Sequence, residues 1–528
     1  MGLLSDDQSM KRVPEIDVER EISNDSFVTK EEEVYCSSVM ENGTYHRGLF
    51  AGLLRIEAWL DKKVGVESEA IERKRPEDRK PIKWYEELNM AFLWASGTMN
   101  LACCATGMLG WEFGLDLKQS LLIIFFGSLL GSMATAYCAT FGAATGLRQM
   151  SVSRYCFGWY PNKILALVNT VQQIGWSAVG AITGGLALTA VADGHISIVV
   201  GIIIIAAAAL IIGLFGLRLI MIVERYAWFV FFVIFLIIFG ETGKYADNHS
   251  PAKATGTTPL AGAALTFLAV VYGSSASWAT IASDYYVQYP VNVNKYKVFL
   301  LTTCGLCIPT SIGMWSGAVM ASALDNHPDW KQSYEQGGIG YLIRDILYPV
   351  GFAKFLLVIL VLSGIAINLL NTYSAAISFQ QISPWLAYVP RIIWQVVLFG
   401  IVIALGLAGR EELNSYLQNF LSLLGYWCTS YILIILMEHS VIRKGSFDNY
   451  DLDGWNDKKR LPHGIAAAVV FLVGVVCWVM GMAETWYVGP LAGLFGETGG
   501  DLANEFTFTF TLLAYLPLRL LELKFFNK

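Results

Sequence analysis

Polar and aromatic residues recur at helical spacing inside the apolar run 164–191. Gln172, Trp176 and Gly180 stand four residues apart and therefore share one face of an α-helix. This face offers an amide, a flat ring and open space beside a glycine. A ligand site and a polar helix–helix contact with a packed indole both account for the pattern, so the spacing leaves two readings open.

A second apolar run, 352–380, carries two amides close together. Asn368 and Asn371 are three residues apart, so their side chains point roughly the same way. Each amide both donates and accepts hydrogen bonds, which suits two-point recognition of a heterocycle. Hydrogen bonding between neighbouring helices is the alternative use of such a pair.

Small and hydroxylated residues weaken two further runs. Within 261–286, residues 272–285 read YGSSASWATIASDY, and we expect this helix to break halfway. The small residues of 89–110 predict the same break there. Discontinuous helices of this kind bind solutes at the midplane of secondary transporters, and matching breaks predict two inverted repeats of five helices.

Membrane-spanning helices are the elements that must position these residues. The chain has 55% hydrophobic residues and a mean hydropathy of +0.50, and its apolar runs approach the ~20 residues that cross a bilayer. Residues 196–216 contain no ionisable side chain. We therefore predict an all-α polytopic protein of the lipid bilayer with about twelve spans. The runs are 89–110, 121–141, 164–191, 196–216, 228–240, 261–286, 298–322, 352–380, 391–408, 415–437, 465–482 and 506–523.

Lysine and arginine gather in the loops that follow even-numbered spans, as around Arg148, Arg218 and Lys295. The positive-inside rule places those loops, and both termini, in the cytoplasm.

With this topology, Asp284 lies near the cytoplasmic end of the sixth span. It is a candidate proton site, and its position favours a charge pair at a helix end or gate.

Residues 1–87 differ from the rest of the chain because they are polar and rich in acidic residues. We expect a cytoplasmic tail, in which residues 47–63 form an interfacial helix or, as the alternative, a plain linker. Lys11 and Lys30 lie among acidic residues and are candidate sites at which a ubiquitin ligase would act.

The lack of several sequence motifs argues against some classes of protein. The chain shows no Walker, dinucleotide-binding, zinc or catalytic-triad signature, so we expect neither an enzyme nor an ATP-driven pump, no cofactor or metal, and no nucleic-acid partner. Cys304 and Cys307 lie inside an apolar run and are expected to pack rather than to bind metal. A receptor that senses solute without moving it remains an alternative to a transporter.

Sequence motifs spread over most of the chain resemble those of fungal purine-cytosine permeases in the nucleobase:cation symporter-1 family, and the likeness begins near Gly65. The motifs are Gly146-Leu147-Arg148-Gln149-Met150, Ser153-Arg154-Tyr155, Ser283-Asp284-Tyr285, Asn294-Lys295-Tyr296-Lys297, Gly425-Tyr426, Glu438-His439, Pro462-His463-Gly464, Gly499-Gly500-Asp501 and Leu520 to Lys524.

This resemblance implies a LeuT-like fold with two inverted five-helix repeats and two additional helices, in a multi-pass protein of the plasma membrane. The corresponding division of the chain is 1–87 for the tail, 88–240 and 260–437 for the repeats, 438–463 for a cytoplasmic loop, 464–523 for the additional helices and 524–528 for the C-terminus.

The resemblance also implies a binding site. Trp176 and Trp278 would enclose a flat solute by stacking, and Asn371 would hold its polar edge. The family usually has an amide at Gly180, an asparagine at Ile367, a proline at Leu370 and a serine at Cys103. Each polar group left unpaired costs about 1 to 3 kcal/mol, so Gln172 or Asn368 would have to substitute.

Cytosine and purines are the substrates that the resemblance favours. Vitamin B6 transporters of the same branch also resemble this chain, at Asn371-Thr372-Tyr373 and Gly481-Met482-Ala483, so pyridoxine is the alternative. Sodium sites of this fold use hydroxyls on the eighth span, where Ser363 is followed by Gly364. The small number of hydroxyls at this turn favours protons as the coupling ion.

A substitution tests the predicted pocket. We expect Gly180→Asn to strengthen nucleobase uptake, because it restores the amide that the family usually has at this position.

Overall fold

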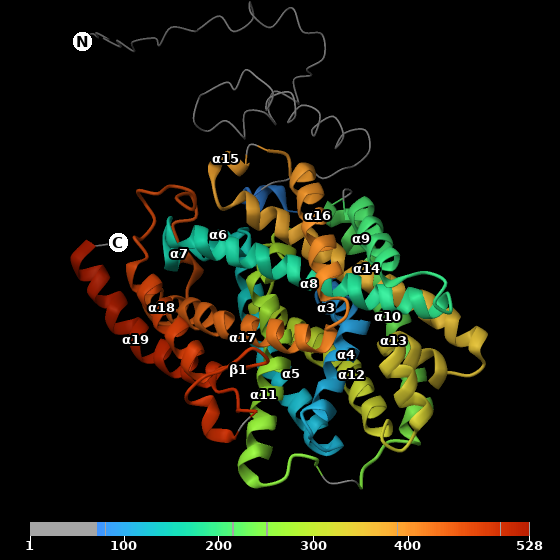
Figure 1. Ribbon diagram of the computed structural model, residues 1–528. Coiled ribbons are helices and arrows are strands. Elements are labelled where there is room, and N and C mark those ends of the chain that lie inside the picture. Colours follow the sequence, from blue (N-terminus) through green and yellow to red (C-terminus); the bar gives the residue numbers. More distant parts are fainter. Residues whose placement is uncertain are drawn as a thin grey trace, which may run out of the picture.

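The computed structural model describes residues 71–79, 81–213, 216–249, 252–387, 389–496 and 498–526. The predicted interfacial helix over 47–63, Lys11 and Lys30 lie outside the described residues. The regular secondary structure of the described chain is helical apart from one small hairpin, and the helices are gathered into a bundle (Figure 1).

Twelve spans emerge from the described residues, as predicted. Nine helical segments are long and apolar enough to cross a bilayer, and two shorter apolar helices and a broken first span accompany them. In chain order the spans are α3 (Asn89–Thr98) with α4 (Leu101–Glu112), α5 (Leu117–Thr145), α8 (Pro161–Val191), α9 (Ile198–Gly213), α10 (Gly216–Gly243), α11 (Thr257–Ala276) with η4 (Ser277–Thr280) and η5 (Ala282–Tyr285), α12 (Lys295–Ala323), α14 (Val350–Gln380), α16 (Arg391–Gly409), α17 (Leu413–Met437), α18 (Ile465–Gly481) and α19 (Ala503–Phe526).

The first and sixth spans are both discontinuous, as the small residues predicted. Met99 leaves the helical conformation between α3 and α4, and the side chain of Asn100 caps α4 by accepting a hydrogen bond from the Cys103 amide. In the sixth span α11 ends at Ala276 and short 3₁₀ turns follow. Such breaks expose backbone groups inside the bundle, where they line solute sites.

Helices at matching positions of the two predicted repeats pack against each other. Contacts join α5 to α12, α8 to α14 and α9 to α16. Glycines permit the closest approaches: a Cβ atom at Gly107 of α4 would overlap the Met314 carbonyl of α12, and a Cβ at Gly317 of α12 would overlap the Cys104 carbonyl of α4. This mutual packing is how two repeats form one core.

Several short elements were not predicted. The helix α13 (Pro328–Ile346) follows α12 and changes direction at Gly337 and Gly338, and polar residues within it hide it from a hydropathy search. The others are α6 (Gln149–Val152), α7 (Arg154–Phe157), α15 (Pro384–Ala387), η2 (Pro76–Asp78), η3 (Glu86–Leu88), a π-helical turn η6 (Glu438–Ile442), η7 (Phe447–Asn449), η8 (Ala492–Phe495) and the hairpin β1 (Ala483–Glu484) with β2 (Tyr487–Val488).

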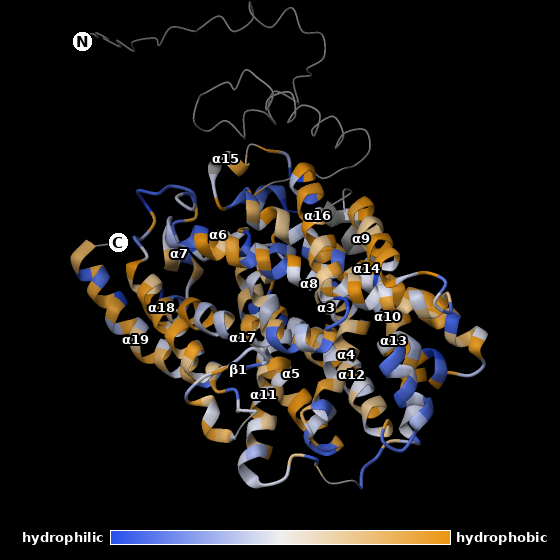
Figure 2. Cartoon of the chain, viewed as in Figure 1, coloured by the Kyte–Doolittle hydropathy of each residue, from blue (hydrophilic) through white to orange (hydrophobic). Residues whose placement is uncertain are grey.

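Hydrophobic residues predominate along the spans (Figure 2), and many of their large apolar side chains are exposed. Leu472 on α18 and Leu513 on α19 are about two-thirds exposed, at 64% and 65%, which is unfavourable in water and favourable against lipid. Hydrophilic residues gather instead in α13 and in the loop that leads to α18. The surface therefore fits a bilayer, as predicted.

Candidate functional site

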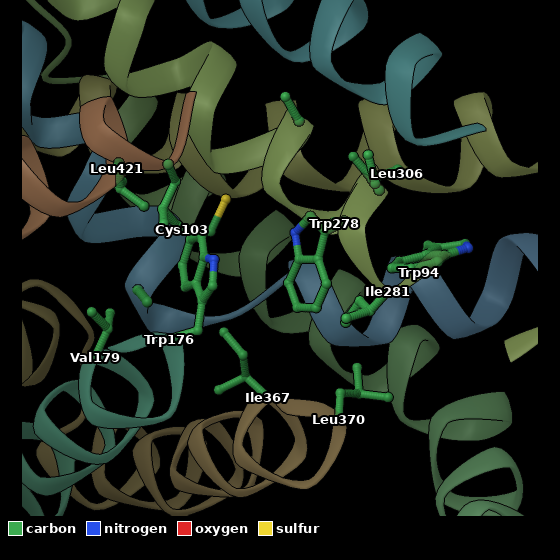
Figure 3. Close-up of a cluster of buried hydrophobic side chains, with 14 of the residues drawn as sticks. Trp94, Cys103, Trp176, Val179, Trp278, Ile281, Leu306, Ile367, Leu370 and Leu421 are labelled. Carbon is green, nitrogen blue, oxygen red and sulfur yellow. The ribbon is translucent and has the colours of Figure 1, made fainter. Parts of the chain in front are cut away.

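Two tryptophan rings meet in the middle of the bundle (Figure 3). Trp176 projects from α8 and Trp278 from η4; both are buried, their ring centroids are 5.8 Å apart and their planes differ by 22°. Trp176 Nε1 also donates to Ser277 Oγ at 3.2 Å. This separation falls within the range of about 4.5 to 7 Å for direct ring pairs, so a flat solute must separate the rings to lie between them.

Buried amide atoms without partners lie on the two long helices of this region. Neither amide atom of Asn371 has a hydrogen-bond partner, and the same is true of Asn368 Oδ1 on α14 and Gln173 Oε1 on α8. All three residues are almost fully buried. A buried polar group without a partner costs about 1 to 3 kcal/mol, so a solute that supplied complementary groups would stabilise this arrangement.

Helical spacing on α14 shows which way Asn371 points. Ile367, Asn371 and Ser374 recur on one face. Ile367 packs against Gly180 of α8, and Ser374 Oγ lies 3.0 Å from the Tyr285 hydroxyl of η5. Asn371 stands between them and therefore faces α8 and the broken sixth span, where the tryptophan pair lies.

Gln172 makes contacts of the interhelical kind. Its Nε2 donates to the Ser277 carbonyl and to Thr280 Oγ1, both at 2.8 Å. Its Oε1 accepts from Trp427 Nε1 of α17 at 2.9 Å. The amide thus joins α8 to η4 and α17. The neighbouring Gln173, which sequence reasoning did not select, is the glutamine with an unpartnered oxygen.

The open space predicted at Gly180 is filled, and this is a correction. A Cβ atom at Gly180 would overlap Ile367 Cγ2 and would lie 3.0 Å from Asn368 Nδ2. Asn368 Nδ2 itself donates to the Gly364 carbonyl at 2.9 Å. An asparagine at 180 alone therefore has no room, because α8 and α14 approach closely here.

The other departures from the family pattern belong to the same cluster. Figure 3 shows Cys103 beside Trp176, with Ile367 and Leu370 projecting from α14 toward the two rings. Cys103 Sγ donates to the Thr310 carbonyl at 3.2 Å. Apolar or weakly polar groups therefore lie beside the rings, and the unpartnered amides of α14 and α8 are among the polar partners that a solute could use.

Ser363 directs its hydroxyl into its own helix. Its Oγ donates to the Leu360 carbonyl at 2.6 Å. The following Gly364 lies against the Gly180 carbonyl, 2.8 Å from where its Cβ would stand. In this turn, Gly364 thus serves the close packing of α14 on α8, and Ser363 bonds within α14.

On the side predicted to be cytoplasmic, Asp284 belongs to a buried closure between α6, η5 and α14. Its Oδ1 accepts from the Gln149 amide at 2.8 Å, and Arg148 Nη1 donates to its carbonyl at 2.9 Å. Arg148 Nη2 also donates to the Tyr373 hydroxyl at 3.1 Å. Gln149 Oε1 accepts from Ser283 Oγ at 2.6 Å. These contacts join the sixth span to the eighth.

On the opposite side, α17 covers the tryptophan pair. The Phe420 ring meets Trp176 edge to face, with centroids 5.9 Å apart and planes at 77°. A Cβ at Gly175 would overlap the same ring. The pair is thus held between the polar closure at Asp284, on the side predicted to be cytoplasmic, and an aromatic cover from α17.

Comparison with known proteins identifies the family of this site. Residues 80–500 match the family model described as a permease for cytosine/purines, uracil, thiamine and allantoin. The chain belongs to this permease family. It is therefore a multi-pass membrane transporter, and the predicted family and fold class are confirmed.

Characterised relatives cover most of the chain. It is 34% identical to the purine-cytosine permease fcyB of Emericella nidulans, over 92% of this chain and 94% of that one. It is 37% identical to the purine-cytosine permease FCY21 of Saccharomyces cerevisiae, over 84% of each, and 32% identical to the vitamin B6 transporter TPN1 of the same organism, over 89% and 90%.

Solved structures agree on the fold. The nucleobase-cation-symport-1 transporter Mhp1, in a closed conformation with bromovinylhydantoin bound, matches with a TM-score of 0.63 at 14% identity, over 87% of this chain and 97% of that one. A Na⁺-coupled sialic acid symporter matches with a TM-score of 0.57 at 13% identity, over 89% and 96%. At these identities the likeness concerns the fold alone.

Proposed function

We propose that this permease imports a small flat N-heterocycle, with cytosine and purine nucleobases as the first candidates, together with protons and by alternating access. The observation that carries the proposal is the stacked pair of Trp176 and Trp278, together with the unpartnered amide of Asn371 on the face of α14 that packs against α8. The names of the purine-cytosine permeases to which it is similar agree with this choice.

Binding follows from the geometry. The solute enters between the rings and replaces one ring contact with two, and stacking adds about 0.5 to 1.5 kcal/mol per pair beyond area burial. Asn371 then pairs with its polar edge. Three of the four unpartnered atoms, on Asn368, Asn371 and Gln173, are acceptor oxygens, which suits a ring that carries N–H donors.

Pyridoxine is the second candidate. The contact between Gly180 and Ile367 places an apolar side chain where purine-cytosine permeases usually have two amides. Such a surface suits a ring that bears a methyl group. The 32% identity to a vitamin B6 transporter adds support.

Topology and coupling complete the proposal. We infer that both termini are cytoplasmic, in the plasma membrane, with the division of the chain at 88–240, 260–437 and 464–523. The turn of α14 at Ser363 offers one hydroxyl because Gly364 follows it, and we infer protons rather than sodium as the coupling ion on this ground. We also propose that ubiquitin attachment at Lys11 and Lys30 shortens the lifetime of the protein at the cell surface.

The test is uptake of radiolabelled cytosine by a yeast strain that lacks its own nucleobase and vitamin B6 permeases, with surface abundance measured in parallel. We expect accumulation that adenine and hypoxanthine compete for, that a protonophore abolishes and that sodium replacement at constant pH leaves unchanged. Uptake of labelled pyridoxine without cytosine uptake supports the second candidate. Binding that saturates at one solute per protein without accumulation favours a solute-sensing receptor instead.

A further inference from the structure

Two acidic residues are buried together far along the chain from the tryptophan pair. Glu484 lies in β1, directly after α18, and Asp501 lies just before α19; they are 3% and 0% exposed. Both contact Tyr426 of α17. We call Glu484, Tyr426 and Asp501 the carboxyl triad.

The number of hydrogens needed for these contacts indicates that the carboxyl triad binds a proton in addition to the phenolic hydrogen. The Tyr426 hydroxyl lies 2.9 Å from Glu484 Oε1 and also bonds Asp501 Oδ2. A phenol carries one hydrogen and can donate to only one acceptor. The second oxygen–oxygen contact therefore requires a hydrogen on one of the two carboxyl groups, which then donates to the phenolic oxygen.

The surroundings supply no positive charge to offset two carboxylates. In the described chain, neither Glu484 nor Asp501 makes a hydrogen bond or ion pair with a Lys, Arg or His side chain. Asp501 accepts from the amides of Ala483 and Ala503, at 3.4 and 3.0 Å, whereas Glu484 Oε2 is buried without a partner.

The titratable groups near the carboxyl triad also favour a bound proton. Beyond Tyr426, the groups that face the triad are Tyr487 of β2 and Glu505 of α19, while α11 contributes the neutral Thr266. Burial raises the pKa of both Glu484 and Asp501, and each is raised further by a neighbouring acidic group. A proton is therefore retained above the pH at which an exposed carboxyl loses it.

The carboxyl triad is also connected to the tryptophan site. Trp427, the residue after Tyr426 on α17, donates to Gln172, and Gln172 donates to the Ser277 carbonyl next to Trp278. The same helix places Phe420 on Trp176. A shift of α17 at Tyr426 therefore changes the cover and the lining of the solute site together.

We propose that the carboxyl triad is a proton-binding site that attaches α17 to the connection between α18 and α19. A proton from the predicted extracellular side binds one carboxylate and completes the hydrogen bonds of the triad. Its release leaves two buried carboxylates around one hydroxyl and loosens α17. This inference rests on the proposed proton-coupled import and names where the proton binds.

Thermal unfolding of the detergent-purified full chain tests the site without transport. The raised pKa values mean that the folded protein holds a proton that the unfolded chain releases above its ordinary carboxyl pKa values of 4.5 and 3.8. Stability must therefore fall as the pH rises from the acidic range through the raised pKa values. Glu484→Gln keeps the shape without the titrating group, so we expect its Tm to depend less on pH; Asp501→Asn gives a second such variant.

Uptake tests the link to transport. In the wild type we expect the substrate uptake rate at low solute to fall by up to about tenfold per pH unit above the pKa of the triad. In Glu484→Gln this dependence flattens while solute binding, followed by tryptophan fluorescence, remains. Glu411→Gln, at an exposed carboxylate before α17, is the matched control and retains the wild-type profile.

Different results would contradict the carboxyl triad as a proton site and proton-coupled import as the function. Tm profiles of Glu484→Gln and Asp501→Asn that follow the wild type across pH overturn the carboxyl triad as a proton site, whatever uptake does. Wild-type uptake that resists a protonophore refutes proton-coupled import, while an altered Tm profile still supports the bound proton. If either amide variant does not fold, Tyr426→Phe removes the shared hydroxyl, which lowers the pKa of both carboxyl groups by hydrogen bonding, and is expected to raise the pH at which stability is lost.

Discussion

Gly180 on α8 makes room for Ile367 on α14. A side chain at 180 would overlap Ile367 Cγ2 and crowd the Asn368 amide. The glycine at 180 is therefore needed because a large side chain stands at 367. The two departures from the purine-cytosine permease pattern are thus one local change in packing beside the tryptophan pair.

The first prediction concerns this pair of positions. Gly180→Asn alone should lower surface-normalised cytosine uptake and reduce stability by about 1 to 3 kcal/mol, as expected for overpacking. Gly180→Asn combined with Ile367→Asn should restore stability and raise cytosine uptake relative to pyridoxine. Uptake of both labelled solutes by the single and double variants checks this, and a fully active single Gly180→Asn variant contradicts it.

Asn371 carries the second prediction. Because both of its amide atoms are unpartnered, Asn371→Leu should raise the Tm of the solute-free protein. It should also weaken solute binding by about 1 to 3 kcal/mol. Fluorescence titration and thermal unfolding of purified protein measure both effects.

The control for Asn371 is an amide whose hydrogen bonds are satisfied. Asn169 donates to Ser378 Oγ at 2.8 Å and accepts from Thr280 at 2.6 Å, so Asn169→Leu should lower the Tm. If Asn371→Leu also lowers the Tm, its amide is a structural hydrogen-bonding group and the proposed role is wrong.

The third prediction concerns the tryptophan rings. Trp278→Ala should abolish saturable uptake, whereas Trp278→Phe should retain part of it because an aromatic face remains for stacking. Trp228, which stacks on Phe92 away from this site, provides a control: Trp228→Phe should leave uptake unchanged. Equal uptake by Trp278→Ala and wild type would exclude stacking as the source of recognition.

The fourth prediction concerns the closure at Asp284. Asp284→Ala removes the acceptor of the Gln149 amide and should open the side predicted to be cytoplasmic. Cys138 is buried next to this closure and its carbonyl accepts from Ser283. A thiol reagent should therefore label Cys138 faster in the variant, in a background where the other cysteines are replaced.

Asp116→Ala is the control for that experiment, because it removes a helix-capping aspartate at the other end of α5. Its labelling rate at Cys138 should stay at the wild-type value. Equal labelling of Asp284→Ala and wild type would mean that the closure does not depend on this carboxylate.

Local composition was sufficient to predict the spans and their breaks. Hydropathy identifies a helix that must face lipid, and the glycines and serines around Trp278 weaken the helix wherever the rest of the chain lies. The helix α13 was missed because its polar residues interrupt the apolar signal. Hydropathy therefore predicted the architecture and left the connecting elements unpredicted.

The role of each polar residue depended on partners distant in the chain. Gln172 and Asn371 look alike in the sequence, yet Gln172 is satisfied by Trp427, 255 residues away, and Asn371 has no partner. From the sequence alone Gly180 predicted open space, whereas in the structure Ile367 packs against it. The shared proton of Glu484 and Asp501 likewise requires Tyr426 between them. Hydrogen-bond satisfaction and packing are properties of pairs, and only folding brings these pairs together.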